Sequence, residues 1–146
     1  LALRGLGTLA VRMERASSNA LAASEFLASV LGASAVHYPG LATHADHALA
    51  RRQFGEQFGS MVTFTLPGGT DAATKFMAAT PEIPFCPSLG ELSTTISHPE
   101  STSHRALSAE QRAALGIAGG TLRLSVGIES REAIVQALGR GLAGLT

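Results

Sequence analysis

The sequence predicts one α+β domain: about four short strands in a mainly antiparallel sheet, with helices packed on one face. Two segments, 61–66 and 121–126, alternate apolar and polar residues in the way that half-buried strands do. Segments with helical periodicity lie between the strands without the regular spacing of β-α-β units. A chain of 146 residues fits a single domain and can bury roughly two-thirds of its surface.

The elements follow from local patterns along the chain. Apolar residues at helical spacing among alanines predict one long helix over about 1–31, which ends at Gly32. Pro and Gly pairs mark the turns after the first two strands, and Ser108 with Gln111 forms a capping box. The remaining elements are a strand over 35–38, a helix over 43–54, a strand over 61–66, a helix over 71–79, a strand over 94–98, a helix over 108–116, the strand over 121–126 and a helix from about 131.

Arg123 is the most informative single residue. Leu122, Leu124 and Val126 alternate with Arg123 and Ser125, so the arginine is expected on the face opposite the local core. A guanidinium fixed on a strand can grip a carboxylate with two parallel hydrogen bonds. An ordinary arginine on the solvated face of an antiparallel sheet gives the same pattern. The pattern by itself leaves both interpretations open.

Composition excludes several function classes. Eleven basic residues balance eleven acidic ones, which gives no indication of a nucleic-acid partner or an anionic membrane. No apolar run reaches the length of a membrane span. Cys86 is the only cysteine, so no internal disulfide forms, and a reducing, cytoplasmic location is expected. The chain starts at Leu1 rather than Met, so we expect that the beginning of the protein is absent from it.

Three local motifs are interpreted as unremarkable. Gly5 to Ala10 matches the dinucleotide-binding fingerprint in letters only, because no strand can precede its glycines. His44 and His47 share a helical face but lack a further metal ligand nearby, so no metal site is expected. Cys86 has no histidine or acid at a spacing that supports a catalytic pair.

Several separated segments, taken together, resemble the C-terminal domain of the cystathionine γ-synthase-like family of pyridoxal-phosphate enzymes. Their order and spacing match the family over essentially the whole chain. The segments are Gly5 to Met13, Tyr38-Pro39-Gly40-Leu41, Arg52-Gln53, Ser88-Leu89-Gly90, His98-Pro99, Ser101-Thr102-Ser103-His104 and Arg123 to Glu129. The sequence departs from the family at Pro87 and Glu91, where an acidic residue and a second glycine are common.

The resemblance implies the small C-terminal domain of the aspartate-aminotransferase-like fold, spanning residues 1–146, with the cofactor-binding large domain absent from the chain. It also implies that Arg123 binds the substrate's α-carboxylate and that Ser88 lies beside it. Pyridoxal 5′-phosphate (PLP) is expected in the intact protein, with none bound to this chain and no catalytic residue within it. Lys75 is the single lysine, and we interpret it as a solvated helix residue, with the Schiff-base lysine in the missing domain.

The reaction implied is γ-replacement or β/γ-elimination on O-acylhomoserine, cystathionine or methionine, and the sequence does not separate transferase from lyase. The implied partners are the amino-acid substrate, the chain's own large domain and further copies in a homo-oligomer. A different hypothesis is a free-standing, non-catalytic interaction domain of the same fold.

Overall fold

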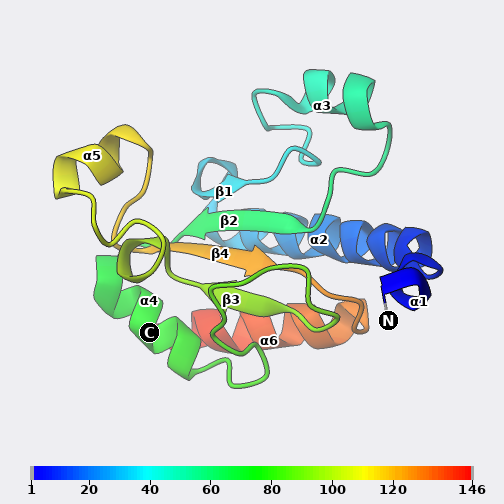
Figure 1. Cartoon of the computed structure of the whole chain (residues 1–146). Helices are drawn as coiled ribbons and strands as arrows, with labels where there is room; N and C mark the ends of the chain where they lie inside the picture. Colours follow the sequence, from blue (N-terminus) through cyan, green and yellow to red (C-terminus); the bar gives the residue numbers. More distant parts are fainter. Residues whose placement is uncertain (1, 146) are drawn as a thin grey trace.

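The computed structural model describes residues 2–145, which form a four-stranded sheet with helices against it (Figure 1). The order across the sheet is β1 (Val36–His37), β2 (Met61–Thr65), β4 (Thr121–Ser125) and β3 (Thr95–Ser97). Each neighbouring pair of these strands is antiparallel. The predicted α+β class and antiparallel sheet are confirmed.

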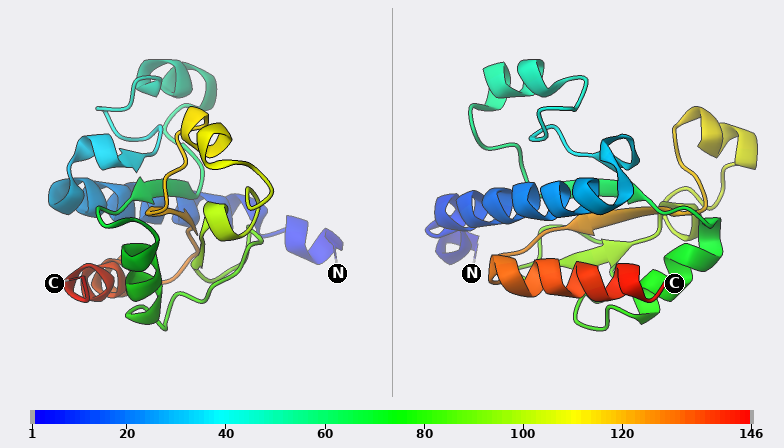
Figure 2. Two further views of the ribbon diagram at one scale, coloured as in Figure 1. Left: turned by 90° about the vertical axis from the view of Figure 1, so that its left-hand side faces the viewer. Right: turned by 180° about the vertical axis from the view of Figure 1, so that it is seen from behind.

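Three helices cover one face of the sheet: α2 (Leu9–Leu31), α4 (Gly69–Ala78) and α6 (Arg131–Ala143). Seen from behind in Figure 2, α2 and α6 lie in front of the strands. Two shorter helices, α3 (His47–Phe54) and α5 (Ala109–Ala114), stand away from this layer (Figure 1). The face of the sheet opposite α2 and α6 is therefore left without a layer of long helices.

The alternation of each strand separates the core from the other face. The side chains toward the helices are at most 1% exposed and pack with buried residues of α2, α4 and α6; they are Val62, Phe64, Ile96, Leu122 and Leu124. Burial of each such side chain contributes about 1.5–3 kcal/mol. The intervening positions of the same strands are polar except for Met61: Thr63, Thr65, Thr95, Ser97, Thr121, Arg123 and Ser125. We call this second side of the sheet the open face.

The predicted long helix over 1–31 is interrupted, and Leu1 lies outside the described residues. A five-residue helix, α1 (Ala2–Leu6), ends before Gly7, and α2 begins at Leu9. Arg12 holds the break by donating from Nη2 to the Gly5 carbonyl oxygen at 2.8 Å. No residue of α1 is buried. With no core contact to favour a continuous helix, the low helical propensity of Gly7 ends it.

Other boundaries also differ from the prediction. The first strand is only two residues long and follows a 3₁₀ turn, Ala33–Ala35. Helix α3 begins at His47 behind Asp46, so Thr43 does not cap it. Helix α4 begins two residues earlier than predicted, after Gly68 in the left-handed conformation. An unpredicted 3₁₀ turn, Pro99–Ser101, follows β3. The predicted capping box of α5 is confirmed, because Ser108 and Gln111 hydrogen-bond each other's backbone N–H.

Tyr38 ties the exit of β1 to two other parts of the fold. It is fully buried, and its hydroxyl donates to the carbonyl oxygens of Gly59 at 2.9 Å and Ser17 at 3.3 Å. Burial raises the pKa of the Tyr38 phenol above its ordinary value of 10.0, because the phenolate would lose its hydration. The neutral, hydrogen-bonded phenol is thus part of the folded state.

We expect the free energy of unfolding to fall at alkaline pH because of Tyr38. The folded chain retains the phenol proton where the unfolded chain releases it, so the stabilisation is complete below pH 10.0 and is lost as the pH rises through the folded-state pKa. Tyr38 is the chain's single tyrosine, so phenolate absorbance of the purified chain reports this residue alone. A titration midpoint at or below 10.0 would contradict the prediction. Tyr38→Phe should abolish the phenolate signal and cost about 1 kcal/mol at neutral pH.

Candidate functional site

Arg123 lies in the middle of β4, on the open face. Thr63 of β2 and Ser97 of β3 flank it in register, while the adjacent Leu122 and Leu124 are fully buried on the helix side. The face predicted for Arg123 from its alternation is therefore confirmed. Its side chain is half-buried, and no acidic side chain within residues 2–145 forms an ion pair with it. A partly desolvated, unpaired guanidinium is well suited to bind an anion.

The segment Pro87–Gly90 lies over the open face beside Arg123. Arg123 donates from Nη2 to the Pro87 carbonyl oxygen at 3.5 Å, which is at the limit of a hydrogen bond. The backbone N–H of Gly90 donates to Ser125 Oγ at 3.0 Å. Ser88 lies between these two anchor points and is exposed. The structure thus brings Ser88 and Arg123, 35 residues apart in the numbering, into one neighbourhood.

The turn after β4 is fixed by a buried polar network. The Glu129 carboxylate accepts hydrogen bonds from the backbone N–H and the hydroxyl of Thr94, and the Thr94 hydroxyl accepts one from the Gly127 N–H at 3.0 Å. Asn19 of α2 donates from Nδ2 to the carbonyl oxygens of Gly127 and Glu129 at 3.0 and 2.9 Å. The network holds the end of β4, just after Arg123 and Ser125, against α2 and the entry to β3.

Sequence reasoning missed the roles of Asn19, Thr94 and Glu129. The available signal in the sequence was Asn19, a polar residue within an alanine-rich helical segment. Its burial, with 1% of its surface exposed, is known only from the fold. Buried polar side chains are almost always hydrogen-bonded, and Asn19 Nδ2 finds its partners outside the helix, whereas Asn19 Oδ1 has none among the described residues.

A hollow of about 330 Å³ opens on the same face as Arg123. It is lined by Arg123, Thr63, His37 and His104 together with Pro99, Thr121 and residues 115–117. Apart from Arg123, these lining residues are uncharged or histidine. A small polar ligand that reaches Arg123 therefore has room beside it.

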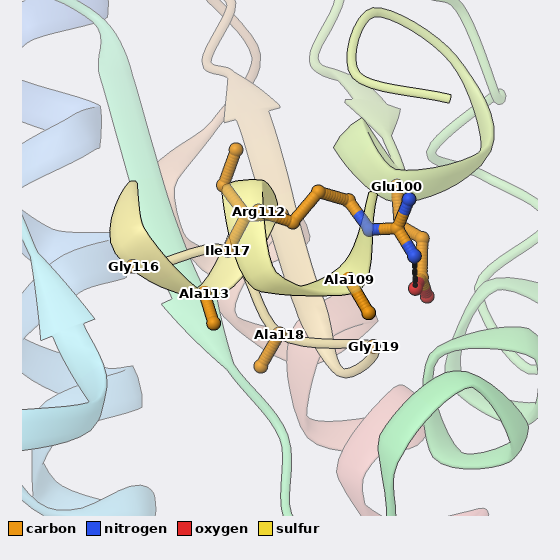
Figure 3. A pocket seen from close by; sticks show the side chains of 8 residues that line it. All are labelled: Glu100, Ala109, Arg112, Ala113, Gly116, Ile117, Ala118 and Gly119. Atoms are coloured by element: carbon orange, nitrogen blue, oxygen red, sulfur yellow. Dashed lines mark ion pairs between the residues drawn. The ribbon is translucent and has the colours of Figure 1, made fainter. Parts of the chain in front are cut away.

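A larger hollow, of about 420 Å³, lies under α5 and is shown in Figure 3. Its two charged residues pair with each other, because Arg112 Nη2 lies 2.9 Å from Glu100 Oε1. Thr70 also donates to Glu100, at 2.9 Å. The two charged side chains of this hollow therefore neutralise each other, whereas Arg123 has no ion-pair partner among the described residues.

The two histidines and the cysteine that the sequence offers as possible ligands or nucleophiles lie in local contacts of their own. His47 Nδ1 lies 2.8 Å from the Pro39 carbonyl oxygen, and His44 Nδ1 accepts the Asp46 N–H at 3.1 Å. Within residues 2–145, no group of three or more His, Cys, Asp or Glu side chains is placed to hold a metal ion. Cys86 is a half-buried free thiol. No helix in the described part of the chain is long and apolar enough to cross a membrane.

Comparisons with known proteins identify the family. Residues 1–143 match the profile of the family described as "Cys/Met metabolism PLP-dependent enzyme". The chain belongs to this family. Its members are enzymes that depend on PLP and include lyases and transferases.

Two relatives and one solved structure illustrate the match. An O-succinylhomoserine sulfhydrylase of Pseudomonas aeruginosa is 44% identical over 99% of this chain and 36% of its own length. An L-methionine gamma-lyase of Fusobacterium nucleatum is 40% identical over 96% of this chain and 35% of its own. The crystal structure of a cystathionine gamma synthase from Xanthomonas oryzae in complex with cystathionine superposes with a TM-score of 0.84, at 43% identity over 98% of this chain and 37% of that one. The chain thus spans about a third of the length of these relatives.

The described residues do not fit the covalent attachment of PLP. Lys75, the single lysine, is exposed near the end of α4. Its helix packs through Ala73 and Phe76 into the core on the side of the sheet away from Arg123. A Schiff-base lysine needs a desolvated position to lower its pKa. Lys75 and the open face therefore do not form one site.

Proposed function

We propose that this chain is the small C-terminal domain of a PLP-dependent sulfur amino-acid enzyme and that Arg123 binds the substrate's α-carboxylate, with Ser88 beside it. The observation that carries the proposal is the half-buried guanidinium of Arg123, which has no ion-pair partner in residues 2–145. It lies under the Pro87–Gly90 segment, which contains Ser88. A planar guanidinium binds a carboxylate through two charge-assisted hydrogen bonds. Membership in a family of PLP-dependent Cys/Met enzymes supports an amino acid as the ligand.

In this proposal the cofactor supplies the chemistry and this chain binds the substrate. PLP, held by residues outside this chain, supplies the electron sink for chemistry at the substrate. Arg123 binds and orients the carboxylate, and the Pro87–Gly90 segment, which contacts the guanidinium through the Pro87 carbonyl oxygen, places Ser88 beside the bound substrate. The reaction is γ-replacement or β/γ-elimination on O-acylhomoserine, cystathionine or methionine. Relatives named for both kinds of reaction support this range.

We also propose that the partner of this chain is its own large domain. Helix α1 and the start of α2 project from the body of the fold (Figure 2). Leu3, Leu6 and Val11 on this projection are 85%, 61% and 69% exposed. Apolar side chains gathered on a projecting segment favour burial against another surface.

The intact protein that contains this chain should show the visible absorbance of bound PLP and turn over at least one member of a substrate panel. The panel is O-succinylhomoserine and O-acetylhomoserine with sulfide, L-cystathionine and L-methionine, assayed for thiol, keto-acid and amino-acid products. Product identity separates replacement from elimination. Absence of both absorbance and turnover would contradict the proposal and favour the free-standing interaction domain.

A further inference from the structure

Ser125 is placed to hold the Pro87–Gly90 segment over the open face. It is 3% exposed and lies on β4 two residues after Arg123, so both side chains face the same side of the sheet. Its Oγ accepts the backbone N–H of Gly90 at 3.0 Å. Gly90 has a φ of +85°, a conformation that residues with a side chain rarely adopt. In this conformation the Gly90 N–H is directed at Ser125 Oγ.

The segment has few other attachments. The preceding backbone is fixed where the Cys86 N–H donates to the Ile96 carbonyl at 2.8 Å, and the following backbone where Ile128 N–H donates to the Leu92 carbonyl at 2.9 Å. Within the described chain, residues 87–91 between these points have two hydrogen bonds to the rest of the fold: the Gly90–Ser125 bond and the 3.5 Å contact from Arg123 to Pro87.

These two attachments respond differently to a bound ligand. A carboxylate on Arg123 competes for its N–H groups with the Pro87 carbonyl, and a charged acceptor at ordinary distance is favoured over a neutral one at 3.5 Å. The Gly90–Ser125 bond involves neither Arg123 nor Ser88. The Gly90–Ser125 hydrogen bond therefore remains when Arg123 binds its ligand, and it keeps the segment and Ser88 in place.

We propose that Ser125 is a positioning residue: through Gly90 it holds the Ser88 segment against Arg123 in the arrangement that binds the substrate. The inference rests on the proposed function of Arg123. A neighbouring hydroxyl provides the contrast, because Thr95 lies opposite Ser125 in register, is also 3% exposed, and its Oγ1 has no hydrogen-bond partner.

In the intact protein, Ser125→Ala should raise the substrate KM about threefold to tenfold and leave kcat within about twofold, because one neutral hydrogen bond that orders the site is lost. The Gly90 amide should exchange its hydrogen faster. Ser125→Thr, which keeps the hydroxyl, should restore most of the wild-type KM. Ser125→Cys, close in shape but a weaker acceptor, should fall between them and replaces the alanine variant if that fails to fold.

Thr95→Val is the matched control, since it removes a buried hydroxyl from the same face without a bond to the segment, and it should leave KM unchanged. In an Arg123→Ala background, Ser125→Ala should add little, because the segment then has no guanidinium to be placed against. A raised KM in Arg123→Ala but an unchanged KM in Ser125→Ala would overturn the role of Ser125 alone. An unchanged KM in both variants would overturn the proposed function as well.

Discussion

Arg123→Ala is expected to raise the substrate KM roughly 30- to 900-fold in the intact protein while the visible absorbance of bound PLP is unchanged. Removing one partner of a desolvated, hydrogen-bonded charge pair costs about 2–4 kcal/mol, which corresponds to that range. The proposed function assigns the binding of PLP to residues outside this chain, so the cofactor signal should persist when Arg123 is replaced. Steady-state kinetics and cofactor absorbance of the same preparation measure both effects.

Arg140→Ala is the matched control for Arg123→Ala. Arg140 lies on α6, is half-exposed and pairs with Glu82 at 2.8 Å. A surface pair of this kind contributes about 0–1 kcal/mol to stability. Its loss should leave KM unchanged, which separates the loss of the binding guanidinium from the general effect of removing a positive charge. A KM for Arg123→Ala equal to that of Arg140→Ala would contradict the role of Arg123.

Gly127→Ala is expected to lower the free energy of unfolding by about 1–3 kcal/mol through overpacking. A Cβ at Gly127 would contact the Leu92 carbonyl oxygen and lie 2.6 Å from the Ser93 carbonyl carbon and 2.5 Å from Glu129 Oε2. Two of these neighbours are backbone atoms, so relief requires the entry to β3 to move away from the end of β4. Urea denaturation of the purified chain should show a lower midpoint with an unchanged slope.

Gly139→Ala provides the control with the opposite expected sign. Gly139 lies inside α6, and a Cβ there would meet only Phe26 at 3.6 Å, an ordinary contact. Replacing a helix-interior glycine with alanine stabilises by about 0.5–1 kcal/mol. Equal midpoints for the two variants would show that the close approach at Gly127 is not needed for the fold.

The strands were predictable where a local alternation determined them. Val62 and Phe64, like Leu122 and Leu124, mark the buried face with a period of two, and the structure places both strands within one residue of the prediction. The interruption of the N-terminal helix at Gly7 and the start of α3 at His47 were not predicted, because both depend on which residues pack against the rest of the fold. Neither the exposure of α1 nor the position of α3 beyond the sheet is encoded in a local pattern.

The candidate site was predictable only in part, for a related reason. The alternation around Arg123 gave its face, but the absence of an acidic partner in the described chain depends on all eleven acidic residues and their places in the fold. The bonds Gly90–Ser125 and Thr94–Glu129 each join residues 35 apart in the chain. Such pairs follow from strand order and register, which local periodicity does not specify.

The most direct test of the central claim compares an amino-acid substrate with its α-carboxamide, in the wild-type protein and in Arg123→Ala. If Arg123 binds the carboxylate, the wild type should favour the acid over the amide in kcat/KM by roughly 30-fold or more, and the variant should lose most of that preference. The same preference in both proteins would mean that the carboxylate is recognised elsewhere and would contradict the account.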